Sequence, residues 1–114
     1  MEVRQEEKRR FPRIGLKTPL RYQIRGTHEF NNSVTDDISL GGISFRNDKY
    51  IAPLTNLMLE IKVLSRVLNP IGKIVWMSPL PHSDRYHYGI EFLEFGPDEK
   101  NYLSQYIDMQ KIKL

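Results

Sequence analysis

Two groups of side chains have the types and spacing to bind a ligand that carries phosphate and guanine. Arg9 and Arg13 stand four residues apart, and guanidinium groups grip phosphate bidentately or donate to the O6 and N7 acceptors of guanine. Further along, Asp37 is followed by Ser39 and Gly42. A carboxylate can accept hydrogen bonds from the N1–H and amino group of guanine, residues two apart in extended chain share a face, and glycine allows close approach of a ligand to the backbone. Together these residues have the chemistry of a guanine-nucleotide site.

The same residues also fit a purely structural interpretation. Lys and Arg recur between Lys8 and His28 with no Asp or Glu among them, and such a run either attracts phosphate or is simply solvated. Asp37 and Ser39 are typical turn residues that bond nearby backbone, and the pair Gly41-Gly42 could supply positive φ. The residues alone therefore leave a nucleotide site and a solvated basic face with a polar turn both open.

Composition narrows the class of protein. The chain has 114 residues, a net charge of +3, 39% hydrophobic residues and no cysteine. This predicts one soluble domain without a disulfide framework or thiolate metal site. No stretch reaches the about 18 apolar residues of a membrane span, and the charged N-terminus lacks the apolar core of a signal peptide. We therefore expect a cytoplasmic protein that does not insert into membranes.

The sequence offers no recognisable catalytic arrangement. His28, His82 and His87 are scattered, and no nucleophile, base and orienting group stand at a familiar spacing. Metal ligands are not clustered. The pair Gly41-Gly42 has neither the spacing of a phosphate-binding loop nor the Lys that follows one. We expect no enzymatic activity, no metal and no cofactor.

Alternation of apolar and polar residues predicts short strands that must position these groups. It is clearest from Leu57 to Val63 and from Tyr86 to Phe92. The period changes only near the end, where Pro97 opens a helix. About six strands and one C-terminal helix favour an all-β sandwich or barrel, with the helix covering an open end or a free edge. The expected strands cover residues 20–25, 34–35, 43–45, 57–63, 71–77 and 86–92, and a loop is expected over 78–84.

Single aromatic residues have structural interpretations first. Phe11 and Ile14 are expected to anchor the N-terminal segment to the core. Trp76 is expected to pack in the core or at a barrel rim because of its large apolar area, and the functional alternative is a wall for a guanine base.

The order and separation of the two motifs resemble the PilZ domain family. Arg9-x-x-x-Arg13 is followed about two dozen residues later by Asp37-x-Ser39-x-x-Gly42. The resemblance runs from about Lys8 to Ile107, and either motif alone would be weak evidence. It extends to the segments Phe11-Pro12-Arg13-Ile14, Gly41-Gly42, Ile74-Val75-Trp76 and Tyr88-Gly89-Ile90-Glu91-Phe92 and to the terminal helix.

The resemblance implies a six-stranded antiparallel β-barrel with a C-terminal helix over residues 14–110, preceded by a flexible basic arm over residues 1–13. It further implies a receptor for the bacterial second messenger cyclic di-GMP. By motif position, Arg9 and Arg13 would contact guanine and phosphate, and Arg10 would add a stacking or phosphate contact. In the family, the residue before the first motif arginine influences whether one ligand or a stacked pair binds, and Lys8 leaves this open here. Asp37, Ser39 and Gly42 would hold a guanine on the barrel surface.

The expected mechanism is ordering of residues 4–13 against the barrel, which changes the surface that an unidentified downstream protein contacts. Two other functions remain as alternatives. One is a protein-interaction module of the same fold that needs no ligand. The other is a binder of single-stranded nucleic acid resembling an OB-fold, which is disfavoured because the basic residues gather at one end and the aromatic residues alternate inward.

Overall fold

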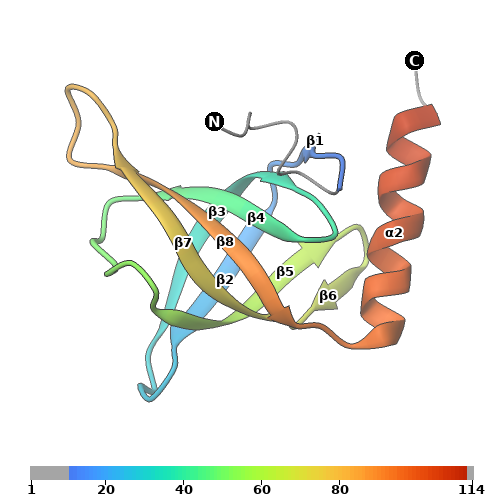
Figure 1. The fold of residues 1–114 in the computed structure, drawn as a ribbon, viewed down its shortest axis with the longest axis horizontal. Coiled ribbons are helices and arrows are strands. Elements are labelled where there is room, and N and C mark those ends of the chain that lie inside the picture. Colours follow the sequence, from blue (N-terminus) through green and yellow to red (C-terminus); the bar gives the residue numbers. More distant parts are fainter. Residues whose placement is uncertain (1–10, 113–114) are drawn as a thin grey trace, which may run out of the picture.

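The computed structural model describes residues 11–112, and Arg9 and Arg10 of the predicted site lie outside this range. Eight strands in one sheet and one helix lie within it. Figure 1 shows their arrangement. The elements are β1 (Ile14–Gly15), β2 (Pro19–Ile24), β3 (Phe30–Ile38), β4 (Gly42–Asn47), β5 (Asn56–Val63), β6 (Arg66–Leu68), β7 (Ile71–Pro79), β8 (Tyr86–Glu94) and α2 (Pro97–Ile112).

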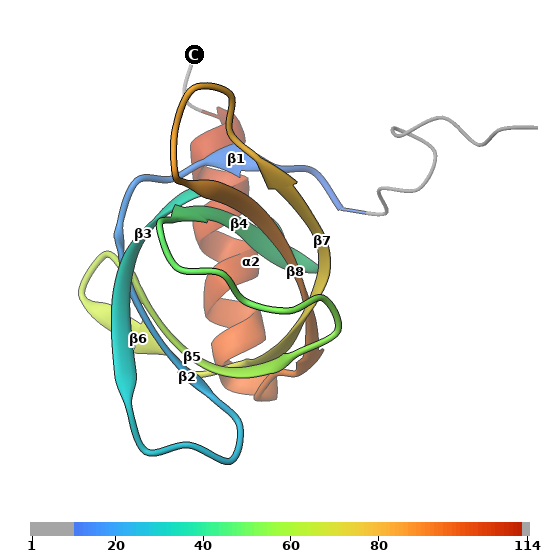
Figure 2. The same cartoon turned by 90° about the vertical axis from the view of Figure 1, so that its left-hand side faces the viewer.

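Six of the strands close into a barrel. Hydrogen bonds join them antiparallel in the order β3–β2–β5–β7–β8–β4, and β4 pairs back with β3. The closed ring is seen end-on in Figure 2. The two short strands lie outside the ring, where β1 pairs with β3 and β6 pairs with β5. The predicted six-stranded antiparallel barrel is confirmed, and closure leaves each barrel strand with a partner on both sides.

The core fills the barrel because apolar residues alternate along its strands. In β5, Leu57, Leu59, Ile61 and Val63 are buried, whereas Met58 between them is 46% exposed. Three aromatic rings pack inside: the Phe45 ring centroid lies 5.6 Å from that of Tyr22 and 5.3 Å from that of Tyr88. The buried hydroxyl of Tyr88 donates to the Lys49 carbonyl oxygen and accepts from the Ile51 amide. Period-two alternation therefore identified the inward side of the strands.

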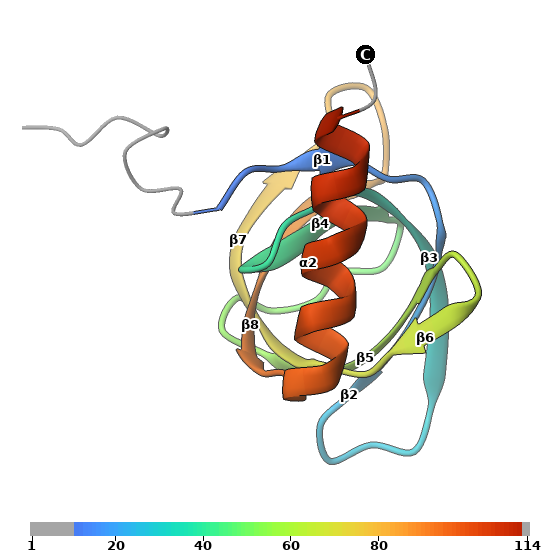
Figure 3. The same cartoon turned by 90° about the vertical axis from the view of Figure 1, so that its right-hand side faces the viewer.

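Helix α2 lies across one open end of the barrel, as Figure 3 shows. Leu103, Tyr106 and Ile107 join the buried core, as their helical spacing predicts. The Tyr102 hydroxyl donates to the Val63 carbonyl oxygen at 3.1 Å, and Glu99 in the first helical turn accepts from the Asn69 amide at 3.0 Å. The helix is thus fastened to the β5–β6 end of the barrel by packing and by hydrogen bonds.

Some element boundaries differ from the prediction. Strand β6 was not expected, because it follows a two-residue turn at Leu64, whose φ of 57° is unusual for a leucine and has no sequence signature. Residues Ser78 and Pro79 belong to β7 rather than to the expected loop, and Pro79, at the last position of the strand, is opposite Tyr86. Strand β3 also begins earlier than expected, at Phe30.

Candidate functional site

The short strand β1 brings Arg13 to Asp37. In the β1–β3 pairing, Gly15 is opposite Asp37 and Ile14 is opposite Ile38. The Arg13 Nη1 atom lies 3.8 Å from the Asp37 Oδ2 atom, and each side chain is 31% exposed. Two residues from different motifs therefore meet on the outside of the barrel, in a position that solvent and a ligand can reach.

A β-bulge sets the direction of the Asp37 side chain. The register between β3 and β4 shifts between Thr35 and Asp37, which leaves Asp36 as the extra residue. Thr35 and Ile38 are fully buried, so the bulge allows two consecutive carboxylates to face outward between them. The Ser44 hydroxyl on β4 then donates to the Asp37 Oδ1 atom at 2.9 Å.

The turn between β3 and β4 is held by Ser39 and by the close approach of Gly42 to β8. The Ser39 side chain is buried, and its hydroxyl accepts from the Gly41 amide at 3.1 Å. The Ser39 amide donates to the Gly42 carbonyl oxygen at 2.8 Å. A Cβ atom on Gly42 would overlap the carbonyl oxygen of Ile90. Neither Gly41 nor Gly42 has a positive φ, so the expectation that the glycine pair supplies one is wrong.

A row of outward-facing residues crosses the barrel from β3 to β7. In register, Asp37 is opposite Ser44, Ser44 is opposite Gly89, and Gly89 is opposite Trp76. The indole of Trp76 lies over Gly89, where a Cβ atom would overlap it. Its ring stands edge-on to His87, with the centroids 4.9 Å apart. Trp76 is therefore partly exposed on the outer face and is not one of the buried core residues.

Beside this row, Asp36 organises a charged cluster. Its side chain is 14% exposed and pairs with Lys17, with the Arg46 Nε atom at 2.9 Å and with the His87 Nε2 atom at 3.4 Å. Burial by itself would raise the pKa of Asp36, but the hydrogen bond from Lys17 and the charges of Arg46, Lys17 and His87 together hold it below its usual range. Asp36 is therefore a carboxylate that stays ionised well into acid.

His87 is the titratable group at the centre of this face. Its Nε2 atom is buried and has no hydrogen-bond partner among the described residues. Burial lowers the pKa of His87, and the attraction of Asp36 offsets only part of this effect. The imidazole therefore favours its neutral form between Trp76 and the Asp36 carboxylate.

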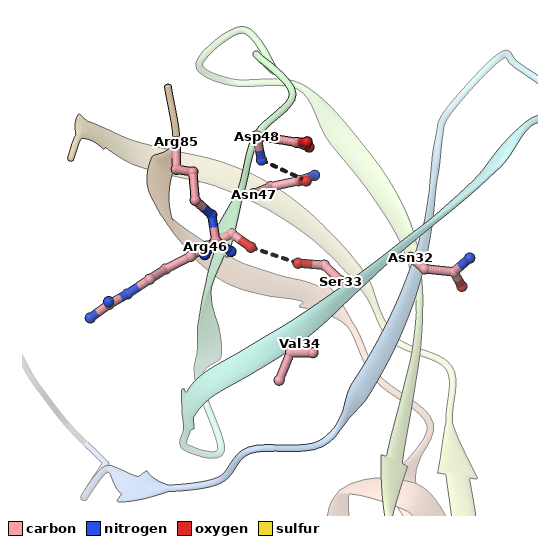
Figure 4. Close-up of a pocket in the computed structure, with 7 residues that line it drawn as sticks. All are labelled: Asn32, Ser33, Val34, Arg46, Asn47, Asp48 and Arg85. Atoms are coloured by element: carbon pink, nitrogen blue, oxygen red, sulfur yellow. Dashed lines mark hydrogen bonds between the residues drawn. The ribbon is translucent and has the colours of Figure 1, made fainter. Parts of the chain in front are cut away.

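A shallow hollow of about 390 Å³ adjoins the charged cluster at Arg46, and Figure 4 shows the residues that line this hollow. It shares Arg46 with the charged cluster and contains no residue of either motif. The side chain of Arg46 extends away from Asn32 and Asp48 (Figure 4). The residues that line the hollow are Asn32, Ser33, Val34, Arg46, Asn47, Asp48 and Arg85.

Comparison with protein families decides the family. Residues 7–109 match the model of the PilZ domain. The chain belongs to the PilZ domain family. A search of curated proteins finds no match to this PilZ chain.

Solved structures share the PilZ fold. The inhibitor of motility MotI/DgrA from Bacillus subtilis matches with a TM-score of 0.80 and 20% identity, over 98% of this chain and 57% of its own. YcgR from Escherichia coli, in complex with c-di-GMP, matches with a TM-score of 0.76 and 16% identity, over 92% of this chain and 46% of its own. The PilZ domain of YcgR with c-di-GMP matches with a TM-score of 0.69 and 16% identity, over 88% of each chain. This chain thus spans about half the length of MotI and of the longer YcgR chain.

Sequence reasoning missed several residues of this PilZ outer face: Asp36, Ser44, Arg46, His87 and Gly89. The outward orientation of Ser44 could have been predicted from the sequence, because Ser44 lies between the apolar residues Ile43 and Phe45. The bulge at Asp36 and the pairing of β4 with β8 could not have been predicted from it. Within residues 11–112, no three His, Cys, Asp or Glu side chains gather closely enough to hold a metal ion. No helix in that range has the length and apolar character that a bilayer crossing requires.

Proposed function

We propose that this PilZ domain is a receptor for cyclic di-GMP that binds the ligand on the outer face of β3, β4, β8 and β7. The observation that carries the proposal is the meeting of Arg13 and Asp37 across the β1–β3 pairing, 3.8 Å apart and both partly exposed. Family membership and the fold shared with structures of YcgR that contain c-di-GMP support it.

Each proposed contact follows from the chemistry of the side chain. Asp37 accepts from the N1–H and amino group of one guanine, and Arg13 donates to phosphate or to the O6 and N7 edge. Trp76 offers an aromatic wall for a base. Ser44 and Gly89 lie between Asp37 and Trp76 but are buried, and the Trp76 indole covers Gly89, so a base would contact the indole rather than these two residues.

Ser39 and Gly42 support the site through the backbone. The Ser39 hydroxyl already bonds the Gly41 amide, and Gly42 is packed against the Ile90 carbonyl oxygen. Their proposed role is to keep the turn after Asp37 in one shape, so that the carboxylate of Asp37 is presented to the base.

Binding exchanges one ion pair for several ligand contacts. The Arg13–Asp37 pair is partly exposed, and such pairs contribute only about 0–1 kcal/mol. A guanine can therefore take the Asp37 oxygen atoms at low cost while Arg13 turns to a phosphate. In the same proposal, Arg9 and Arg10 add cations from an arm of residues 1–13, and the ligand orders residues 4–13 of this arm against a barrel of residues 14–110. A downstream protein then reads the changed surface.

Calorimetry with cyclic di-GMP tests the proposal. The intact chain should bind, and Arg13→Ala should weaken binding by about 1.5–3 kcal/mol, the range for hydrogen bonds to charged groups. Arg21→Ala is the matched control, because Arg21 is a partly exposed arginine that pairs with Glu60 at 3.3 Å on the β2–β5 side of the barrel. GTP should compete weakly, because it lacks the second guanine. Equal affinities of the intact chain and the Arg13→Ala variant would refute the site.

A further inference from the structure

The outer face carries an arginine that belongs to neither motif. Arg46 lies on β4, two residues after Ser44, and therefore on the same face of the strand. It stands opposite His87 on β8 and opposite Val34 on β3. Its side chain is 50% exposed.

Asp36 holds Arg46 by one edge only. The Arg46 Nε atom donates to the Asp36 Oδ2 atom at 2.9 Å. Within residues 11–112, the two terminal amino groups of this guanidinium make no hydrogen bond or ion pair to a side chain. Since a guanidinium carries five N–H donors in a rigid fork, four donors remain for another acceptor.

The pairing directs Arg46 toward the predicted ligand. Asp36 precedes Asp37 directly at the bulge, so the Asp36 contact draws the guanidinium from β4 toward β3. The row from Asp37 to Trp76 spans three strand spacings, about 14 Å, and Arg46 starts about 7 Å from Ser44 along β4. A ligand with two bases and two phosphates that contacts Asp37 and Trp76 would lie within reach of Arg46.

We propose that Arg46 is a further ligand-contacting arginine of this site and that Asp36 is the residue that positions it. The inference rests on the proposed function, and it adds a residue that the motifs do not contain. Arg46 binds a phosphodiester oxygen or the O6 and N7 edge of the guanine away from Asp37. Asp36 acts through Arg46 and does not contact the ligand itself.

His87 supports this arrangement from the β8 side. It lies 3.4 Å from Asp36 and edge-on to Trp76, so it fills the space between the carboxylate and the indole. Burial lowers the pKa of His87, and a neutral imidazole leaves the Asp36 charge to Arg46 and Lys17. The charged groups facing this histidine are Asp36, Asp37, Arg46 and Arg13.

Calorimetry with cyclic di-GMP on the full chain tests the inference. Arg46→Ala should weaken binding about tenfold to one-hundredfold, as for loss of charge-assisted hydrogen bonds. Arg46→Lys keeps the charge but not the fork and should fall between the intact chain and Arg46→Ala. Arg21→Ala, the control on the other side of the barrel, should bind like the intact chain.

A double-mutant cycle tests the positioning role. Asp36→Asn should weaken binding several-fold in the intact background but have no further effect in the Arg46→Ala background, because its action passes through Arg46. A merely structural role would weaken binding equally in both backgrounds. Thermal denaturation shows which variants are folded. If Arg46→Ala is unfolded, Arg46→Gln takes its place in the cycle, because glutamine can still donate a hydrogen bond to Asp36.

The outcomes separate this inference from the proposed function. Binding by the intact chain that is lost in Arg13→Ala but unchanged within about threefold in Arg46→Ala overturns the inference alone. No binding by the intact chain overturns both.

Discussion

The motif glycine Gly42 should be required for folding before it is required for binding. Its position on β4 is opposite Glu91, and a Cβ atom there would overlap the Ile90 carbonyl oxygen and lie 3.3 Å from the Glu91 Cα atom. Both obstructing groups belong to the backbone of β8, which is hydrogen-bonded to β4 and β7. The overlap can therefore be removed only if β4 and β8 move apart. We expect Gly42→Ala to lower the free energy of unfolding by about 2–3 kcal/mol, the upper part of the range for overpacking.

Gly41→Ala is the matched control one residue away. The nearest atom to a Cβ at Gly41 is the Phe11 Cδ2 atom at 3.0 Å, which belongs to a side chain rather than to backbone, and Phe11 is 36% exposed. The φ of Gly41 is not positive. We therefore expect a change of less than about 1 kcal/mol, because alanine also restricts the unfolded chain.

Urea denaturation, followed by the fluorescence of Trp76 and by circular dichroism, measures both variants. Gly42→Ala should show a lower midpoint with an unchanged slope. Equal midpoints for Gly41→Ala and Gly42→Ala would refute the reasoning, since the backbone contact would then carry no cost. At a low temperature at which Gly42→Ala is folded, its affinity for the ligand measures the effect of the substitution on the site separately from its effect on stability.

Three further predictions concern the turn, the wall and the pH dependence. Ser39→Ala removes the acceptor of the Gly41 amide and should cost about 0.5–1.5 kcal/mol in urea denaturation; no loss would mean that water replaces the hydroxyl. Gly89→Ala should displace the Trp76 indole, shift its emission and weaken ligand binding, whereas an unchanged spectrum would contradict the contact. Burial keeps the pKa of His87 in the folded chain below its ordinary value of 6.5. At a pH just below 6.5, the unfolded chain therefore binds more protons than the folded chain. Stability should therefore fall as pH drops from about 7.5 to about 5.5, and His87→Gln should flatten this slope in the same denaturation assay.

The fold was predictable where one local pattern decides it. The buried run Leu57, Leu59, Ile61 and Val63 alternates strictly, and the helix after Gly96 changes the period from two to that of a helix. Two short strands escaped prediction because tertiary pairing creates them. β1 is only two residues long and exists as a strand through its bonds to β3.

The sequence predicts the residue types of the proposed site but not its geometry. The motifs named Asp37, and a carboxylate in that position has a specific chemistry for guanine. The sequence pattern does not predict the one-residue bulge that places Asp36 on the same face of the strand as Asp37. A strand with one extra residue has no distinguishing pattern of residue types. Two of the three side chains that pair with Asp36, those of Arg46 and His87, come from β4 and β8, so their positions depend on a register that only the closed barrel defines.

Asp36 and Asp37, the two adjacent carboxylates at the bulge, differ in exposure and in their partners. Asp36 is 14% exposed and pairs with Lys17, Arg46 and His87, so its charge is used within the protein. Asp37 is 31% exposed, and its partners are the Ser44 hydroxyl and one arginine at 3.8 Å. A ligand that competes for Asp37 displaces a weak pair, whereas a ligand that competed for Asp36 would leave a nearly buried carboxylate without its cations. In the proposed function, base recognition is therefore assigned to Asp37, which has the weaker partners, and Asp36 is assigned the role of ordering the cations around it.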